Sequence, residues 1–111
     1  MVPRRRTARI GCRLAGRWLR CGGAVPIEVA DISAHGLFLN DHDERAALPI
    51  GELQQIEVDL PIATVRLVVV PRHATRGEWS RGVGLQIYAA SELDRNLWLA
   101  CFRQSRVPLR G

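Results

Sequence analysis

The residues Asp-Ile-Ser-Ala-His-Gly at positions 31–36 organise the rest of the chain. They follow an alternating run in which Val25, Ile27 and Val29 share one face of a predicted strand. Asp31 falls on that same apolar face, where a buried carboxylate is costly unless it has partners. The strand is therefore predicted to bend or end at this residue. We interpret the stretch as a shaped polar notch between two strands.

The glycine of this stretch, Gly36, stands where the chain turns into the next apolar run. Such a position calls for a positive φ or for close approach to another group. An ordinary tight turn is the alternative, because Asp and Ser bond their own backbone and Gly closes such turns. These residues alone leave both interpretations open.

Composition indicates one soluble globular domain. The 111 residues are enough to bury a hydrophobic core that needs no disulfide bond or metal site for stability. A content of 47% hydrophobic and 24% charged residues excludes disorder of the whole chain. No apolar run approaches the length of a membrane span. The basic N-terminus lacks the apolar stretch of a secretory signal, so we expect a cytoplasmic protein.

The candidate reactive residues form no recognisable catalytic or metal site. Cys12, Cys21 and Cys101 share no metal-ligand spacing, and the three histidines are scattered. We expect reduced thiols, no metal, no cofactor and no enzymatic activity, since no Ser or Cys has a convincing base.

The net charge is +5, and all 16 basic residues are Arg. A surface rich in Arg favours a polyanionic partner, because its guanidinium groups bind phosphates and base edges in a bidentate way. The densest cluster, Arg4-Arg5-Arg6 followed by Arg9, lies at the start of the chain. Charge alone does not choose between nucleic acid, anionic lipid and a nucleotide.

Alternation predicts a series of short antiparallel strands. One begins at Arg9 and continues, irregularly at Gly16, through Arg20, with a hairpin turn at Gly22-Gly23 before the strand that leads into the notch. Pro26 implies an edge position or a bulge in that strand. The others are predicted at 37–39, 55–60, 65–70 and 81–87.

Proline and glycine punctuate the second half of the chain. Pro61 and Pro71 are predicted to end the strands before them. Gly82 and Gly84 leave one face of the last strand bare, so that another backbone or a ligand can approach it. Ser91 then begins a helix as its cap, with Asp94 in the third position of a capping box.

In this helix Leu93, Leu97 and Cys101 repeat every four residues, with Trp98 and Phe102 beside them, and this apolar stripe is predicted to pack against a barrel mouth or sheet. The elements predict a small closed β-barrel plugged by a C-terminal helix. We expect a flexible Arg-rich arm at 1–8, the barrel domain with its helix at 9–104 and a tail at 105–111.

Hairpin pairing of the first two strands would place the arm beside the notch. A ligand there meets guanidinium groups from one side and the Asp31 carboxylate from the other. An ionised carboxylate only accepts hydrogen bonds, and guanine offers it N1–H and N2–H₂, whereas phosphate oxygens and the O6/N7 edge suit Arg. A phosphorylated guanine nucleotide satisfies both sides.

These residues also resemble the motif pair of the PilZ domain, RxxxR followed by DxSxxG. The first motif is Arg5-x-x-x-Arg9, and the second is Asp31-x-Ser33-x-x-Gly36. The resemblance covers the chain from about residue 4 to residue 102. It implies a six-stranded antiparallel PilZ-type β-barrel that binds the bacterial second messenger cyclic di-GMP.

The resemblance also implies roles for individual residues. Arg5 and Arg9 would grip phosphate and guanine, and Arg4 sits where PilZ proteins with an Arg bind a stacked pair of the dinucleotide. Asp31 and Ser33 would hold a guanine, and Gly36 would let the chain turn beneath it.

The implied protein is a signal-transduction adaptor. Ligand binding would order the arm and change the interaction with an unidentified downstream protein. The process, motility or exopolysaccharide regulation, and a ligand-dependent dimer are left open. So is a contribution of Trp79 to the site, since Pro71 stands about where some relatives carry an aromatic residue.

Two alternative functions compete with this interpretation. The first keeps the fold without the ligand, as a PilZ-like module that docks a partner such as the type IV pilus machinery. The second is a small basic barrel that binds nucleic acid, a class that usually displays stacking aromatics on a strand face. At 5% aromatic residues the chain offers few of these.

Overall fold

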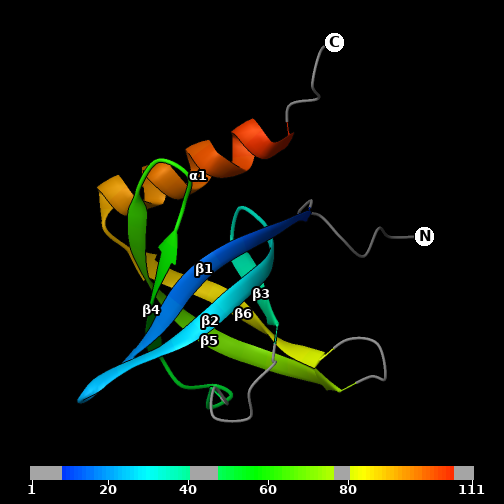
Figure 1. Cartoon of the computed structure of the whole chain (residues 1–111), viewed down its shortest axis with the longest axis vertical. Helices are drawn as coiled ribbons and strands as arrows, with labels where there is room; N and C mark the ends of the chain where they lie inside the picture. Colours follow the sequence, from blue (N-terminus) through cyan, green and yellow to red (C-terminus); the bar gives the residue numbers. More distant parts are fainter. Residues whose placement is uncertain (1–8, 41–47, 77–80, 107–111) are drawn as a thin grey trace.

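The computed structural model describes residues 9–40, 48–76 and 81–106. These residues form a closed antiparallel β-barrel with strand order β1-β2-β3-β6-β5-β4, and a helix lies across one end of it (Figure 1). The predicted six-stranded barrel with a C-terminal helix is confirmed. The elements are β1 (Ile10–Arg20), β2 (Gly23–Ile32), β3 (Gly36–Asn40), β4 (Gln54–Asp59), β5 (Thr64–Arg76), β6 (Arg81–Ala90) and α1 (Glu92–Arg106).

β1 and β2 form a long hairpin and are adjacent strands of the barrel. Their register pairs Arg20 with Gly23, so the two-residue turn is Cys21-Gly22. The predicted turn at Gly22-Gly23 is therefore wrong by one residue. Gly22 has a φ of 88°, which a residue with a side chain rarely adopts, whereas Gly23 is already part of β2.

The predicted bend at Asp31 is a β-bulge. The β2–β3 register shifts between Val29 and Asp31, and the β1–β2 register shifts nearby, between Gly11 and Leu14. A bulge inserts one extra residue and reverses the alternation beyond it. As a result Ile32 takes the core position at 1% exposure, and the Asp31 carboxylate lies outside the core.

Pro71 does not end β5, contrary to the prediction, because the strand continues through it to Arg76. The β4–β5 pairing ends at Val69, so on that side Pro71 has no ladder to which an N–H would donate. A register shift between Pro71 and His73 in the β5–β6 pairing accommodates the ring. Proline is tolerated at such edges and bulges.

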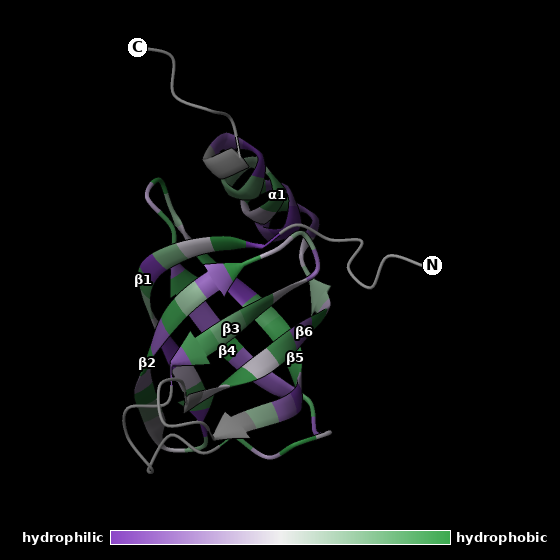
Figure 2. Ribbon diagram, turned by 90° about the vertical axis from the view of Figure 1, so that its right-hand side faces the viewer, coloured by the Kyte–Doolittle hydropathy of each residue, from purple (hydrophilic) through white to green (hydrophobic). Residues whose placement is uncertain are grey.

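The core fills the barrel and continues under α1. Along β4, Ile56 and Val58 point inward and Gln55 and Glu57 outward, as predicted, and Figure 2 shows hydrophobic and hydrophilic residues alternating along the strands. Leu93 is 67% exposed and so does not join the predicted helix stripe. The buried core includes Trp18, Ile27, Val29, Ile32, Leu37, Leu39, Ile56, Val58, Val65, Leu67, Val69, Leu85, Trp98, Cys101 and Phe102.

The start of α1 is fixed by two bonds. Ser91 Oγ accepts a hydrogen bond from the Asp94 N–H at 3.0 Å, which confirms Ser91 as the helix cap. The Asp94 carboxylate accepts one from the backbone N–H of Arg66 in β5, at 3.1 Å. Asp94 therefore ties the helix to the barrel. The helix runs to Arg106.

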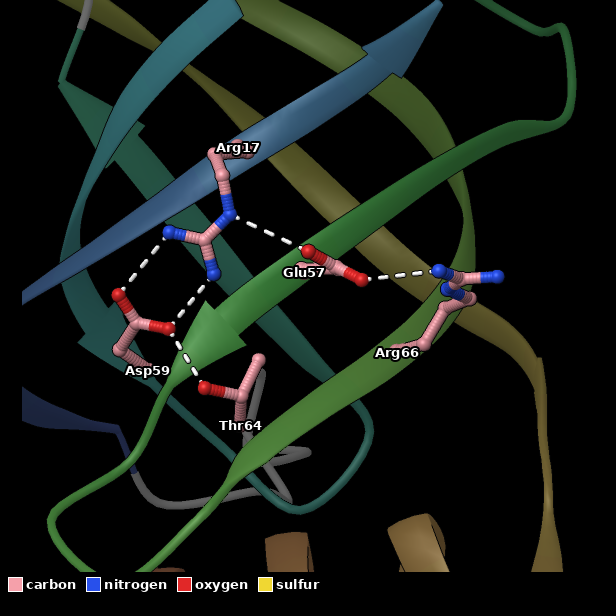
Figure 3. A network of polar contacts seen from close by, with 5 residues as sticks. All are labelled: Arg17, Glu57, Asp59, Thr64 and Arg66. Carbon is pink, nitrogen blue, oxygen red and sulfur yellow. Dashed lines mark hydrogen bonds and ion pairs between the residues drawn. The ribbon is translucent and has the colours of Figure 1, made fainter. Parts of the chain in front are cut away.

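A polar network lies on the outside of the barrel where β1 closes against β4 (Figure 3). The Arg17 guanidinium donates to Asp59 at 2.6 and 3.1 Å and to Glu57 at 3.2 Å. Arg66 of β5 donates to the other oxygen of Glu57 at 2.9 Å, and the Thr64 hydroxyl donates to Asp59 at 2.8 Å. The network thus links β1, β4 and β5 at the closing seam.

We expect this seam to make stability acid-sensitive. Hydrogen bonds from Arg17 and Thr64 lower the pKa of Asp59 to about 2 from its usual 3.8, and those from Arg66 and Arg17 lower the pKa of Glu57. Depressed carboxylate pKa values stabilise the fold fully above the usual pKa. That stabilisation is lost as pH falls from about 4 to about 2.

Thermal unfolding between pH 6 and pH 2 measures this loss. Asp59→Asn is expected to flatten the decline, whereas Glu52→Gln, a change at an exposed loop carboxylate outside the network, should leave it unchanged. An Asp59→Asn profile that overlays the wild-type profile would show that the seam does not control acid stability.

Candidate functional site

The predicted meeting of the Arg-rich segment with the notch is observed for Arg9. The register pairs Gly11 with Asp31, so the start of β1 lies beside the end of β2. Arg9 Nη1 lies 3.4 Å from Asp31 Oδ1, and the two side chains are 42% and 26% exposed. Charge-assisted bonds are usually 2.7–2.9 Å long, so this pair is loose and accessible.

Ser33 and Gly36 close the turn between β2 and β3. The Ser33 N–H donates to the Gly36 carbonyl at 2.9 Å, and the Ser33 hydroxyl donates to the same oxygen at 3.3 Å. Ser33 thus makes the local bonds expected of a tight turn. The two interpretations of this stretch, a polar notch and a tight turn, both hold in part, because the notch is a turn whose outer side carries the Arg9–Asp31 pair.

Contacts from α1 and β6 also hold the turn in place. Trp98 of α1 donates its indole N–H to the Ser33 carbonyl at 2.9 Å, and the Ile87 N–H of β6 donates to the His35 carbonyl at 2.9 Å. Trp98 is 1% exposed. The backbone of the turn is therefore fixed by the helix and by β6, which pre-organises the side chains above it.

Gly36 is required for close approach. The structure gives positive φ only to Gly22 and Gly51 among the described residues, so Gly36 needs no left-handed backbone. A Cβ on Gly36 would lie 2.5 Å from the Leu85 carbonyl oxygen of β6, which cannot swing away. Two reasons for a glycine here were predicted, a positive φ and close approach to another group. The close approach is therefore the one that applies.

Gly36→Ala is expected to destabilise the fold by about 1–3 kcal/mol, because the added methyl pushes β3 away from β6. Gly11→Ala is the matched control, since a Cβ on Gly11 meets nothing within 4 Å. Denaturant unfolding of both variants tests the prediction. Equal free energies of unfolding for the two would contradict it.

The sequence did not predict a strip of side chains that lies beside Asp31. Across the barrel surface the register runs from Asp31 through Phe38 and Gly84 to His73, on the side opposite the core. A Cβ on Gly84 would lie 2.7 Å from His73 Cε1, and one on Gly82 would lie 2.6 Å from the Phe38 ring. The glycine face is therefore covered by two rings rather than left bare.

The sequence feature that indicates this strip is the Gly-x-Gly spacing at Gly82 and Gly84, which predicts that another group approaches this face closely. Which side chains approach depends on two register shifts, one between β2 and β3 and one between β5 and β6. The result is a low surface next to a carboxylate and a guanidinium, with planar rings on its floor. Such a surface suits a planar ligand group.

Cys12 lies on the first strand near this site. Burial and the neighbouring Asp31 charge raise the pKa of the Cys12 thiol to about 11. The thiol therefore stays protonated and unreactive at neutral pH. All three cysteines are free, as expected for a chain without a disulfide.

Several predicted residues lie outside the described part of the chain. These are Arg4 and Arg5, Arg6 beside them, and Trp79, so their contribution to the site stays a prediction. The described residues contain no group of three His, Cys, Asp or Glu side chains that could hold a metal ion. No described helix has the length and apolar character needed to cross a membrane. The absence of enzymatic activity and the cytoplasmic location also stay predictions.

Comparison with solved structures finds chains that share this architecture. Bacillus subtilis MotI/DgrA, an inhibitor of motility, matches with a TM-score of 0.76 and 19% identity over 93% of this chain and 51% of its own. Escherichia coli YcgR in complex with c-di-GMP matches with 0.73 and 16% identity over 93% of this chain and 46% of its own. This chain thus spans about half the length of those two proteins.

The isolated PilZ domain of Escherichia coli YcgR with c-di-GMP matches along nearly all of both chains. Its TM-score is 0.69 at 15% identity, over 94% of this chain and 95% of that domain. No protein-family profile and no curated protein sequence matches. The fold defines a small closed β-barrel with a capping helix. More particularly, it is the fold of the PilZ domain, as the sequence resemblance implied.

Proposed function

We propose that this chain is a receptor for cyclic di-GMP, which binds at the rim formed by Arg9, Asp31, Ser33 and Gly36. The observation that carries the proposal is the Arg9–Asp31 pair, which joins positions separated by 22 residues at one exposed edge. A donor fork and an acceptor carboxylate side by side match the phosphate and the guanine edge of one ligand. The solved PilZ domain of YcgR contains the same ligand.

In the proposed mechanism the ligand replaces the loose ion pair. An exposed pair of this kind contributes about 0–1 kcal/mol, so breaking it costs little. Asp31 then accepts from guanine N1–H and N2–H₂, and Arg9 turns to a phosphate or to the O6/N7 edge. The strip of Phe38 and His73 gives a planar base a floor, and Arg4 and Arg5 supply further guanidinium groups from the preceding segment.

The output is a change in protein–protein interaction. Two cationic side chains drawn onto a dianionic ligand alter the charge and shape of the surface near the turn, without any covalent step. MotI is an inhibitor of motility, and we propose motility or exopolysaccharide regulation as the process here. The partner, and dimerisation on binding, belong to the proposal as well.

Amide-resolved NMR titration with cyclic di-GMP tests the proposal. The largest shifts are expected at residues 31–36 and at the Arg9 side chain, with smaller ones at Phe38 and Gly84. Residues of the closing seam, such as Glu57, serve as internal controls. A titration that leaves residues 31–36 unmoved would contradict the site, whatever happens elsewhere.

The same experiment separates the two alternatives. A partner-docking module without the ligand would show no saturable shifts with cyclic di-GMP. A nucleic-acid-binding barrel would instead respond to oligonucleotides of any sequence, with an affinity that falls steeply as salt rises.

A further inference from the structure

An arginine outside both sequence motifs lies at the far border of the strip. Arg72 is exposed and falls at the register shift between Pro71 and His73, where β5 carries one residue more than β6. Its Nε donates a hydrogen bond to Gln86 Oε1 at 2.7 Å. Gln86 in turn pairs with Gly36, the last residue of the second motif. The Arg72 guanidinium is therefore held over β6, next to the turn that forms the notch.

The contact with Gln86 leaves most of the Arg72 guanidinium available. A guanidinium has five N–H donors, and this contact uses the one on Nε. Among the residues that the structure describes, no carboxylate forms an ion pair with Arg72, whose side chain is exposed. A neutral amide orients the group without cancelling its charge. Arg72 is thus an oriented cation whose Nη donors can bind a ligand.

The strand order places this cation across the strip from the Arg9–Asp31 pair. β2, which carries Asp31, and β6, which carries Gln86, lie on either side of β3, so these two strands are about 10 Å apart. The rings of Phe38 and His73 lie over the glycines of β6 on this same surface. The strip thus has an acceptor at one border, a donor at the other and planar rings as its floor.

We propose that Arg72 binds the O6/N7 edge of a guanine that lies on the strip. The inference rests on the proposed function and deepens it, because it adds a residue that selects guanine on the side away from Asp31. A base on a planar floor presents its edges to the groups at the borders. A guanidinium donates to both acceptors of this guanine edge, whereas adenine places the donor N6–H₂ beside its N7.

A phosphate is the other ligand group that Arg72 could bind. The Arg-rich segment precedes β1, and Arg9 enters the site from the β1 border. The proposed phosphate contacts therefore lie at the border opposite to Arg72. At the Arg72 border the neighbouring side chain is the His73 ring, which belongs to the floor for the base. This arrangement assigns the base edge to Arg72 and leaves phosphate to Arg9.

Cyclic di-GMP and its analogue with 7-deazaguanine in place of both guanines test this contact. The analogue lacks N7 and keeps the N1–H and N2–H₂ donors that Asp31 is proposed to bind. In calorimetric titrations the wild-type chain is expected to bind cyclic di-GMP about three- to tenfold more tightly than the analogue, since one of two bonds to Arg72 is lost. Arg72→Ala should bind the two ligands equally.

Two further variants serve as controls. Arg103→Ala removes the same charge from an exposed position of α1 and should keep the wild-type preference for cyclic di-GMP over the analogue. Arg9→Ala should weaken the binding of both ligands and keep the preference, because Arg9 binds phosphate in this account. Circular dichroism verifies that all three variants fold.

The outcomes separate the inference from the proposed function. If the wild-type chain binds cyclic di-GMP without any preference over the analogue, or if Arg72→Ala retains the preference, the inference is wrong and the proposed function stands. Loss of the preference in Arg9→Ala instead would assign the N7 contact to Arg9. A wild-type chain that binds neither ligand overturns the proposed function, and this inference with it.

Discussion

Asp31→Ala is expected to weaken cyclic di-GMP binding about 5- to 150-fold. The carboxylate is proposed to accept two parallel bonds from guanine, and such a bidentate base contact contributes about 1–3 kcal/mol. The substitution also frees Arg9 from the 3.4 Å contact that orients it. Since Asp31 lies outside the core, the fold should tolerate the change, and calorimetric titration measures the affinity directly.

Glu52→Ala is the matched control for this experiment. It removes one carboxylate from an exposed loop next to β4 and changes the net charge identically. Its affinity should equal that of the wild type, because Glu52 lies outside the proposed site and makes no contact with the ligand there. If the two variants lose affinity equally, the loss at Asp31 does not come from a guanine contact.

Trp98→Ala is expected to cost about 3–5 kcal/mol of the free energy of unfolding, as large-to-small changes at buried aromatic residues do. A small domain has only about 5–15 kcal/mol in total. The loss has two sources, because Trp98 fills the space between α1 and the barrel and bonds the Ser33 carbonyl. Denaturant unfolding measures the total, provided that the variant folds.

Trp98→Phe separates the two sources. The ring packing is largely retained, and the Ser33 carbonyl loses its donor, at a cost of about 1–3 kcal/mol. Trp18→Phe is a matched control, because Trp18 is 4% exposed and bonds Gln54 at 2.9 Å, away from the turn. Only the change at Trp98 should shift the Ser33 and Gly36 amides. Unchanged amides there would show that α1 does not hold the turn.

The parts of the fold that depend on local pattern were predictable. β4 alternates cleanly, and the β1–β2 hairpin follows from two alternating runs joined by a short glycine-containing turn. That hairpin brings residue 9 to residue 31, so the meeting of Arg9 and Asp31 could be inferred without coordinates. Hairpin neighbours in sequence are neighbours in space.

The errors come from how neighbouring strands pair and where each of them ends. Pro71 was predicted to end β5 because proline cannot donate to a ladder, but β4 ends before it and leaves no ladder to serve. The rings on the glycine strip depend in the same way on register across β3, β6 and β5. Local propensity carries no information about where a neighbouring strand stops.

The support of the turn was also beyond sequence reasoning. Trp98 reaches Ser33 across 65 positions, and its place in an apolar helix stripe predicted packing alone. An indole N–H needs a partner when buried, so a bond to some acceptor was foreseeable. Which carbonyl accepts it follows from how α1 crosses the end of the barrel (Figure 1).

Calorimetric titration of the intact wild-type chain with cyclic di-GMP, and separately with cyclic di-AMP, tests the central claim most directly. The two ligands carry the same phosphates, and only guanine presents N1–H and N2–H₂ to a carboxylate. The account predicts saturable heat with cyclic di-GMP and at least about tenfold weaker binding of cyclic di-AMP. Absence of heat at high micromolar cyclic di-GMP, or equal affinity for both dinucleotides, would contradict it.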